Sequence, residues 1–380
     1  MPKSWNFFEK QGNTNLDIDL LKKEVAQRFP FYDMRYDSKS AAFFCRIDKE
    51  SLEEKFEDLR KTLSKKDYIP MLRYEKGEHI IYILKNPKRK EKPIWMNAVL
   101  LIAVIITTVL TGSMLYLGSF DLWSMNNPLD ILIPENLLFG GLLFALPLMS
   151  ILFTHEMGHY FISRKHDIST SFPFFIPIPP ILPYFNIGTF GAIISSNEPM
   201  PDKKALFDVG LAGPLVGFLV AIPVTVFGII KADIVPQVPI EEISEGTTVF
   251  GSSLLIDIFV RLIHNLPTNQ TIDMNPLLFA GWVGLLITSI NLLPAGQLDG
   301  GHIFRAVLGD KQKYLAWAAI LIMIFTGWWF FAFIIIFLMG TTHPPPLNDN
   351  TKLDTKRKIL FLLAIAILLL CFIPYPIYSI

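Results

Sequence analysis

The chain has 380 residues, of which 51% are hydrophobic and 18% are charged. With a mean hydropathy of +0.41 and 31 phenylalanines, it is far more apolar than a soluble domain of this length. Because 34 basic side chains balance 34 acidic ones, the net charge gives no sign of nucleic-acid binding. Two cysteines, Cys45 and Cys371, are too few for a disulfide framework or a thiolate metal site, and we interpret both as packing residues. The composition predicts a polytopic membrane protein.

Residues 1–92 differ from the rest, because they are rich in charge and hold no apolar run that could cross a bilayer. We expect no signal peptide at their start. Helical spacing of apolar residues predicts helices near residues 18–29 and 52–63. Each is followed by two strand-like runs, at residues 31–36 and 41–47 and at residues 68–74 and 79–84, which suggests a helix–strand–strand unit used twice. We predict a small soluble α+β domain, which serves either recruitment or regulation, or as a stabilising appendage.

A basic segment, PKRKEKP at residues 87–93, directly precedes the first long apolar run at about residues 94–117. Positive residues beside a span favour the cytoplasmic side. We therefore expect residues 1–92 in the cytoplasm, and residues 93–380 as an integral domain of a cell membrane. The first span then runs outward, and the second, at about residues 136–163, returns to Arg164 and Lys165.

The second span ends in the sequence His155-Glu156-Met157-Gly158-His159. On a helix, residues four apart lie on one face, so both imidazoles can reach one metal ion while Glu156 stands beside it. Zinc hydrolases use this arrangement, in which two nitrogen ligands leave a position for water and a carboxylate takes the water's proton. The alternative is a pair of helix-packing histidines, but ionisable residues in an apolar span are costly and usually functional.

Residues 171–195 are apolar but contain five prolines, which exclude an ordinary transmembrane helix. Such a backbone is tolerated at membrane depth where protein or water shields it, so we expect a re-entrant or β-hairpin segment. It ends in a β-prone run whose glycines permit close backbone approach. A free strand edge there could bind an extended substrate by β-augmentation, and a purely structural hairpin is the alternative. The candidate substrate-binding residues are Gly188, Thr189, Phe190 and Gly191.

The third span, about residues 205–230, carries the small residues AGPLVG at 212–217, which we interpret as close helix packing rather than chemistry. A polar segment to about residue 275 should lie outside. The fourth span, about residues 276–293, then runs inward and ends in the sequence NLLPAGQLDG at 291–300. Because two histidines do not complete a catalytic zinc site, this segment is the best candidate for a third ligand.

Together, HEMGH on one span and NLLPAGQLDG at the end of another resemble the site-2 protease family of intramembrane zinc metalloproteases. The resemblance covers roughly residues 94–340. It implies that His155, His159 and Asp299 hold the metal and that Glu156 is the general base. The order of the spans agrees, since the second and fourth both end on the cytoplasmic side. The alternative for Asp299 is a helix cap or turn residue.

Two polar residues near this motif have different expected roles. Asn291 is the natural hydrogen-bond donor for the oxyanion that forms on a scissile carbonyl. His302 is expected to be a turn or capping residue rather than a fourth ligand.

Two further apolar runs, at residues 314–339 and 359–373, bring the predicted count to about six transmembrane helices. One conflict arises from this count. Lys356, Arg357 and Lys358 favour a cytoplasmic loop before the last span, whereas six simple crossings put that loop outside. Either the loop departs from the charge rule, or one segment does not cross as a single helix.

We predict an intramembrane zinc metalloprotease that cleaves transmembrane protein substrates within the lipid bilayer. The family resemblance implies that the substrate's outer part is trimmed before this cleavage. The two cuts together are called regulated intramembrane proteolysis. The main alternative is a catalytically silent scaffold or receptor of the same fold, and a zinc-binding transporter is another. Ligand type alone does not distinguish zinc from other divalent ions, and the sequence leaves the oligomeric state open.

Overall fold

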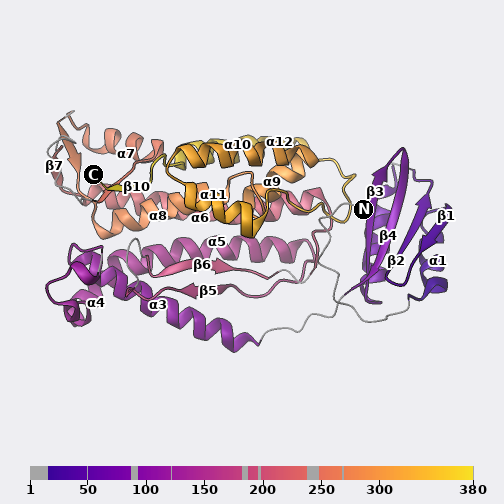
Figure 1. Ribbon diagram of the computed structural model, residues 1–380, viewed down its shortest axis with the longest axis horizontal. Helices are drawn as coiled ribbons and strands as arrows, with labels where there is room; N and C mark the ends of the chain where they lie inside the picture. The colour runs from indigo at the N-terminus through magenta and orange to yellow at the C-terminus, as the bar shows by residue number, and fades with distance from the viewer. Residues whose placement is uncertain are drawn as a thin grey trace.

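The computed structural model describes residues 16–379, except for residues 49, 87–92, 121, 182–186, 196–197, 238–247 and 268. The basic segment before the first span therefore lies outside the described residues, apart from Pro93. Figure 1 shows a long bundle of helices with a sheet-containing domain at one end. We refer to this as the domain end of the bundle, and to the other as the far end.

The domain consists of two helix–strand–strand units in succession, the order expected from the sequence. Its four strands form one antiparallel sheet in the order β1-β2-β4-β3. Leu21 of the first helix and Leu59 of the second are fully buried with Phe43 and Ile81 of the sheet, so the domain has its own core. The elements are α1 (Ile18–Ala26), β1 (Phe31–Tyr36), β2 (Ser40–Cys45), α2 (Leu52–Ser64), β3 (Tyr68–Glu75) and β4 (Glu78–Lys85).

Within the described residues, three helices are long and apolar enough to cross a membrane, as expected of a membrane protein: Ile94–Tyr116, Pro134–Lys165 and Lys203–Ile230. The second contains a π-helical turn in its middle. Pro147 lacks an N–H and its ring crowds the preceding turn, which a wider helical turn accommodates. The helices are α3 (Ile94–Tyr116), α4 (Pro134–Gly140) with the π-helical η4 (Gly141–Ala145) and α5 (Leu146–Lys165), and α6 (Lys203–Ile230).

The proline-rich segment between α5 and α6 is a β-hairpin of β5 (Phe174–Pro177) and β6 (Thr189–Ile193). Thus the β-hairpin form of the expected segment is the one observed. β5 packs against α3, whereas β6 lies on the side of α5 (Figure 1).

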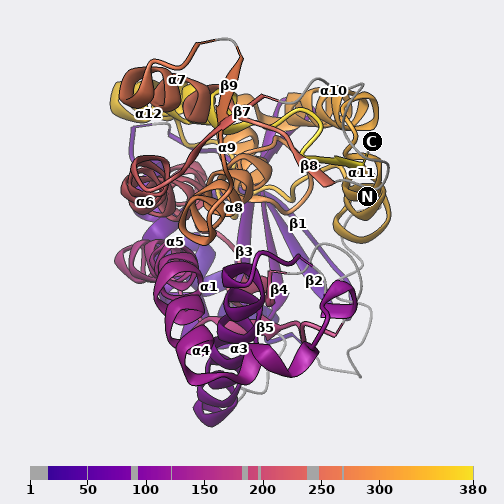
Figure 2. The ribbon, with the colours of Figure 1, turned by 90° about the vertical axis from the view of Figure 1, so that its left-hand side faces the viewer.

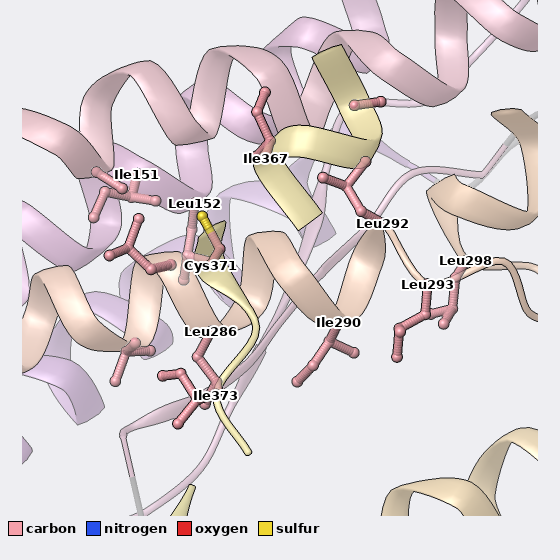
Figure 3. Close-up of a cluster of buried hydrophobic side chains, with 14 of the residues drawn as sticks. Ile151, Leu152, Leu286, Ile290, Leu292, Leu293, Leu298, Ile367, Cys371 and Ile373 are labelled. Atoms are coloured by element: carbon pink, nitrogen blue, oxygen red, sulfur yellow. The ribbon is translucent and has the colours of Figure 1, made fainter. Parts of the chain in front are cut away.

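The remaining helices complete the bundle around α6, which packs against α5, α8 and α9. Side chains of α5, α8 and α12 belong to one buried cluster, part of which is drawn in Figure 3. Seen end-on, α7 and α12 lie on one side and α3 and α4 on the opposite side, with α6 and α8 between them (Figure 2). These elements are α7 (Leu254–His264), α8 (Pro276–Asn291), α9 (Asp299–Leu308), α10 (Gln312–Phe325), α11 (Trp329–Ile334) with π-helical η7 (Ile335–Met339), and α12 (Thr355–Cys371).

Short elements lie mainly at the far end. β7 pairs with β9 and β8 pairs with β10, all antiparallel. The bounds are η2 (Leu122–Ser124), η3 (Pro128–Leu132), β7 (Ile234–Pro236), β8 (Thr248–Phe250), β9 (Gln270–Ile272) and β10 (Ile377–Ser379), with η6 (Gly309–Lys311) joining α9 to α10.

The prediction of one span over residues 314–339 is wrong, because α10 and α11 form an antiparallel hairpin. Gly327, with a φ of +76°, lies in the turn between them. At this turn, the Trp328 indole N–H donates to the Ile373 carbonyl (2.9 Å). At the other end, the Gln312 amide donates to the carbonyl of Thr341 (3.3 Å). Hydropathy shows how apolar a run is and not its direction, so it does not reveal the reversal.

The hairpin resolves the conflict over the last loop. The Leu72 N–H of strand β3 donates to the Leu347 carbonyl (2.8 Å), so the loop before α12 lies at the domain end. Arg357 pairs there with Asp208, which also bonds His166 at the end of α5. The basic residues before α12 thus lie on the same side as Arg164, in agreement with the charge rule.

We predict that the loop before α12 is labelled from the same membrane face as the N-terminal domain. In reconstituted vesicles, an impermeant maleimide should reach Lys352→Cys and Lys39→Cys from one face, and Asn126→Cys from the other. Both native cysteines, Cys45 and Cys371, are buried and give a low background. Labelling of Lys352→Cys together with Asn126→Cys would contradict the hairpin.

Candidate metal centre

Two histidines of α5 point toward a common position. One turn of helix separates His155 from His159, and their Nε2 atoms are 3.1 Å apart. The His155 side chain is buried, and that of His159 is nearly so. Two ring nitrogens therefore converge on one face of an apolar helix.

The third group comes from the start of α9, which follows a short loop after α8. Asp299 is the first residue of α9, and its Oδ2 lies 3.3 Å from the Nε2 atoms of both histidines. The chain reverses tightly to bring it there. A Cβ on Gly300 would lie 2.1 Å from the Leu292 carbonyl oxygen, and one on Gly301 would lie 2.3 Å from the Gly296 carbonyl oxygen. Glycine at both positions is thus required for the carboxylate to reach the histidines.

The spacing of these three atoms fits a zinc ion. Tetrahedral zinc with bonds of about 2.0–2.1 Å has donor atoms about 3.3–3.4 Å apart. The observed separations are 3.1, 3.3 and 3.3 Å, between two imidazole nitrogens and one carboxylate oxygen. Within the part of the chain that the structure describes, this is the one group of three or more such residues that could hold a metal ion. Three protein donors leave a fourth position for water or substrate.

Helix α6 forms the wall behind the histidines. The Nδ1–H of His159 donates to the Val209 carbonyl (2.8 Å), which leaves the Nε2 lone pair directed at Asp299. A Cβ on Gly213 would lie 2.1 Å from His159 Nε2, and one on Gly217 would lie 3.1 Å from His155 Cβ. The absence of side chains at these positions therefore makes room for the imidazoles.

The small residues at 212–217, which we interpreted as packing only, thus also line the metal centre. A signal for this was present in the sequence. Gly213 and Gly217 are four residues apart, the same spacing as His155 and His159. The two helices run antiparallel, so one glycine faces each histidine.

The two predicted catalytic residues lie on the two helices α8 and α5. Asn291, the last residue of α8, has its Nδ2 3.4 Å from His155 Nε2, so its amide adjoins the three donors. Glu156 follows His155 on α5 and is half-buried. His302 lies outside the group of three donors, and its Nδ1 bonds the Leu298 carbonyl (3.1 Å).

The four predicted substrate-binding residues fall into two pairs. Gly188 packs on α3, where Thr107 donates to its carbonyl (2.6 Å), and the buried Thr189 donates to the Ile176 carbonyl (3.0 Å). Phe190 is 77% exposed, and a Cβ on Gly191 would meet no atom within 4 Å. The first pair holds the hairpin together, and the second faces open space.

Comparison with known proteins identifies the family. The model of peptidase family M50, the site-2 protease family, matches residues 143–337, about half of the chain and including both motifs. The chain belongs to peptidase family M50. The family predicted from the two motifs is therefore confirmed, and the match runs from η4 to η7.

Relatives of this M50 member are named as probable zinc metalloproteases of chloroplasts. EGY1 of Oryza sativa subsp. japonica is 33% identical over 172 residues, which cover 45% of this chain and 28% of that protein. EGY1 of Arabidopsis thaliana is 29% identical over 244 residues (60% and 43%), and EGY2 of the same plant is 34% identical over 177 residues (46% and 30%). The chain thus spans less than half the length of these relatives. No solved structure matches it.

We predict that Gly213→Ala weakens metal binding at least about tenfold, because the new methyl group must displace His159. Gly217→Ala is the matched comparison, and we expect a smaller loss, since its Cβ would lie 3.1 Å from His155 Cβ and 3.2 Å from Nδ1, which a shift of a few tenths of an ångström relieves. Metal affinity measured by chelator competition checks the difference. Equal affinities for the two variants would contradict the role of Gly213.

Proposed function

We propose that this chain is an intramembrane zinc metalloprotease, which hydrolyses peptide bonds within or next to transmembrane segments of other proteins. The observation that carries the proposal is the set of three donors at tetrahedral spacing, two of which lie on an apolar helix of membrane-spanning length. The M50 match supports the reaction class, and the printed names of the relatives support zinc.

The chain's own residues supply the steps of hydrolysis. His155, His159 and Asp299 would hold zinc, which when bound polarises a carbonyl and lowers the pKa of water toward about 7. Glu156 accepts a proton from the attacking water and passes it to the leaving amide nitrogen. The Asn291 amide lies beside His155, close to the three donors. From there it donates a hydrogen bond to the scissile carbonyl oxygen as negative charge develops on it.

Strand β6 is the proposed substrate-binding edge. A transmembrane helix hides its amides in internal hydrogen bonds, so the substrate must unwind locally before attack. An extended strand could then pair with β6, which lies between β5 and α5 (Figure 1). Phe190 and Gly191 would contact the substrate, whereas Gly188 and Thr189 would keep the strand in place.

The proposed topology puts the N-terminal domain, residues 1–92, in the cytoplasm and residues 93–380 in a cell membrane. The basic residues Arg164 and Arg357 at the domain end support this orientation. The metal ligands would then lie within the membrane, nearer the cytoplasmic side, because His159 is only two turns from the end of α5. Cleavage there releases a cytoplasmic fragment of a substrate whose outer part has been trimmed, as in regulated intramembrane proteolysis.

The decisive test compares wild type with Glu156→Gln on a reconstituted panel of single-span substrates, with metal content measured for both. We expect equal zinc and a loss of cleavage of about 10²- to 10⁴-fold in the variant, since only the proton acceptor is removed. Glu135→Gln, on the exposed start of α4, is the matched control and should cut normally.

Two outcomes would overturn the proposal. Absence of metal from the wild type would remove the site itself. Zinc in both proteins with no cleavage of any substrate would favour the catalytically silent scaffold.

A further inference from the structure

The loop between α11 and α12 contacts both the N-terminal domain and the helix that carries Asp299. We call its residues 343–349 the linking segment; it includes three consecutive prolines at 344–346. Proline restricts φ, so this stretch is stiffer than an ordinary loop. It also bonds the chain just before α6, where the N–H groups of Leu347 and Asn348 donate to the carbonyls of Met200 and Pro201 (both 2.8 Å). Its two sets of contacts with the domain and with α9 join parts of the chain that are remote in sequence.

The first set attaches the linking segment to the N-terminal domain. It runs along the edge of strand β3, where the Leu72 N–H donates to the Leu347 carbonyl (2.8 Å). The Leu347 side chain is 4% exposed and belongs to the hydrophobic core of the domain. The Arg73 guanidinium donates to the carbonyls of Pro346 (2.8 Å) and Leu347 (2.9 Å). Burial of an apolar side chain stabilises the contact that buries it, so Leu347 holds the linking segment to the domain.

The second set attaches the linking segment to α9. Arg305 is 3% exposed, and its Nη2 pairs with Asp349 Oδ2 at 2.8 Å. One turn closer to the metal centre, the His302 ring packs against the His343 ring with centroids 4.1 Å apart. A buried guanidinium that loses its carboxylate is costly, so the ion pair resists separation of the two segments.

On its other side, α9 lies against α6. A Cβ on Gly210 would come within 2.7 Å of His302 Cβ and 2.9 Å of the Asp299 carbonyl oxygen. Helix α9 is therefore held between the linking segment and α6. Helix α6 also packs against the two histidines of the metal centre. Asp299 at its first residue moves with it.

We infer that the N-terminal domain, acting through the linking segment, positions α9 and thereby the carboxylate of Asp299. Arg305 and Asp349 are positioning residues in this arrangement, and Leu347 is the anchor in the domain. The inference rests on the proposed function, in which Asp299 is a metal ligand. Because Asp299 comes from a different helix from the two histidines, small shifts of α9 change the donor set directly. Metal sites need ligands within about 0.2 Å of their proper distances.

The test uses two variants of the 380-residue chain in detergent. Asp349→Asn weakens the tie to α9, and Leu347→Ser removes the anchor in the domain. For both, we expect zinc affinity by chelator competition to fall about 10- to 100-fold, the usual effect of losing an outer-shell partner. In the metal-free protein, amide hydrogen exchange should become faster in residues 299–308 and stay unchanged in α5.

Each variant has a matched control. Asp310→Asn removes another carboxylate near Arg305, whose Oδ1 lies 3.3 Å from Arg305 Nη2. The Asp310 side chain is 92% exposed and lies outside the linking segment. Glu53→Gln removes an exposed contact of the domain with Lys204, which does not involve α9. Surface pairs of this kind contribute little, so both controls should bind zinc as wild type does.

The outcomes separate this inference from the proposed function. A wild type without metal affinity would overturn the proposed function. Wild-type affinity and unchanged exchange in Asp349→Asn would overturn the inference and leave the function standing. Weak binding by Asp349→Asn with normal binding by Leu347→Ser would mean that the linking segment positions α9 without help from the domain, which contradicts the inference.

Discussion

The membrane part of this protein depends on placing two imidazoles and a carboxylate inside an apolar bundle. Polar atoms removed from water are costly unless they find partners. The structure meets part of this demand with one carbonyl, and it gathers the remaining ligand atoms where a single zinc ion would be their common partner. His159 uses Nδ1 on Val209 and directs Nε2 at Asp299, and His155 directs Nε2 at the same carboxylate oxygen. Each neighbouring element is shaped by this requirement.

Helix α6 shows how one feature meets two demands. In a membrane, small residues let helix backbones approach closely, and a Cβ on Gly158 would lie 2.7 Å from the Ala212 carbonyl oxygen. The same closeness brings the Val209 carbonyl within reach of a side chain on α5. It also makes any side chain at position 213 collide with His159. Close packing and ligand orientation are therefore consequences of one glycine-rich surface.

Features set by residues close together in the sequence could be predicted, and features set by contacts between distant residues could not. The pair His155 and His159 is set by helical periodicity, and the strands of the N-terminal domain by alternation, so both were accessible. The reversal at Gly327 was not, because an apolar run reads alike in either direction. The hydrogen bond from His159 to the Val209 carbonyl cannot be predicted from the sequence either. Every residue has a backbone carbonyl, so no residue type marks the acceptor. The M50 family came from two local motifs, which explains why the domain and its contacts lay beyond that resemblance.

The division of the metal centre between two covalently distant segments has a physical consequence. The histidines share one helix, so their separation is fixed by helix geometry, whereas the distance to Asp299 is a tertiary quantity. Whatever fixes α9 relative to α5 therefore contributes to metal affinity. By thermodynamic linkage, a metal ion that binds across these segments must in turn favour the arrangement that holds α9 in place. In the inferred arrangement, the N-terminal domain, attached to α9 through Leu347 and Asp349, is then energetically part of the centre, although it supplies no ligand. The same linkage offers a route by which a partner of that domain would change metal affinity without entering the membrane.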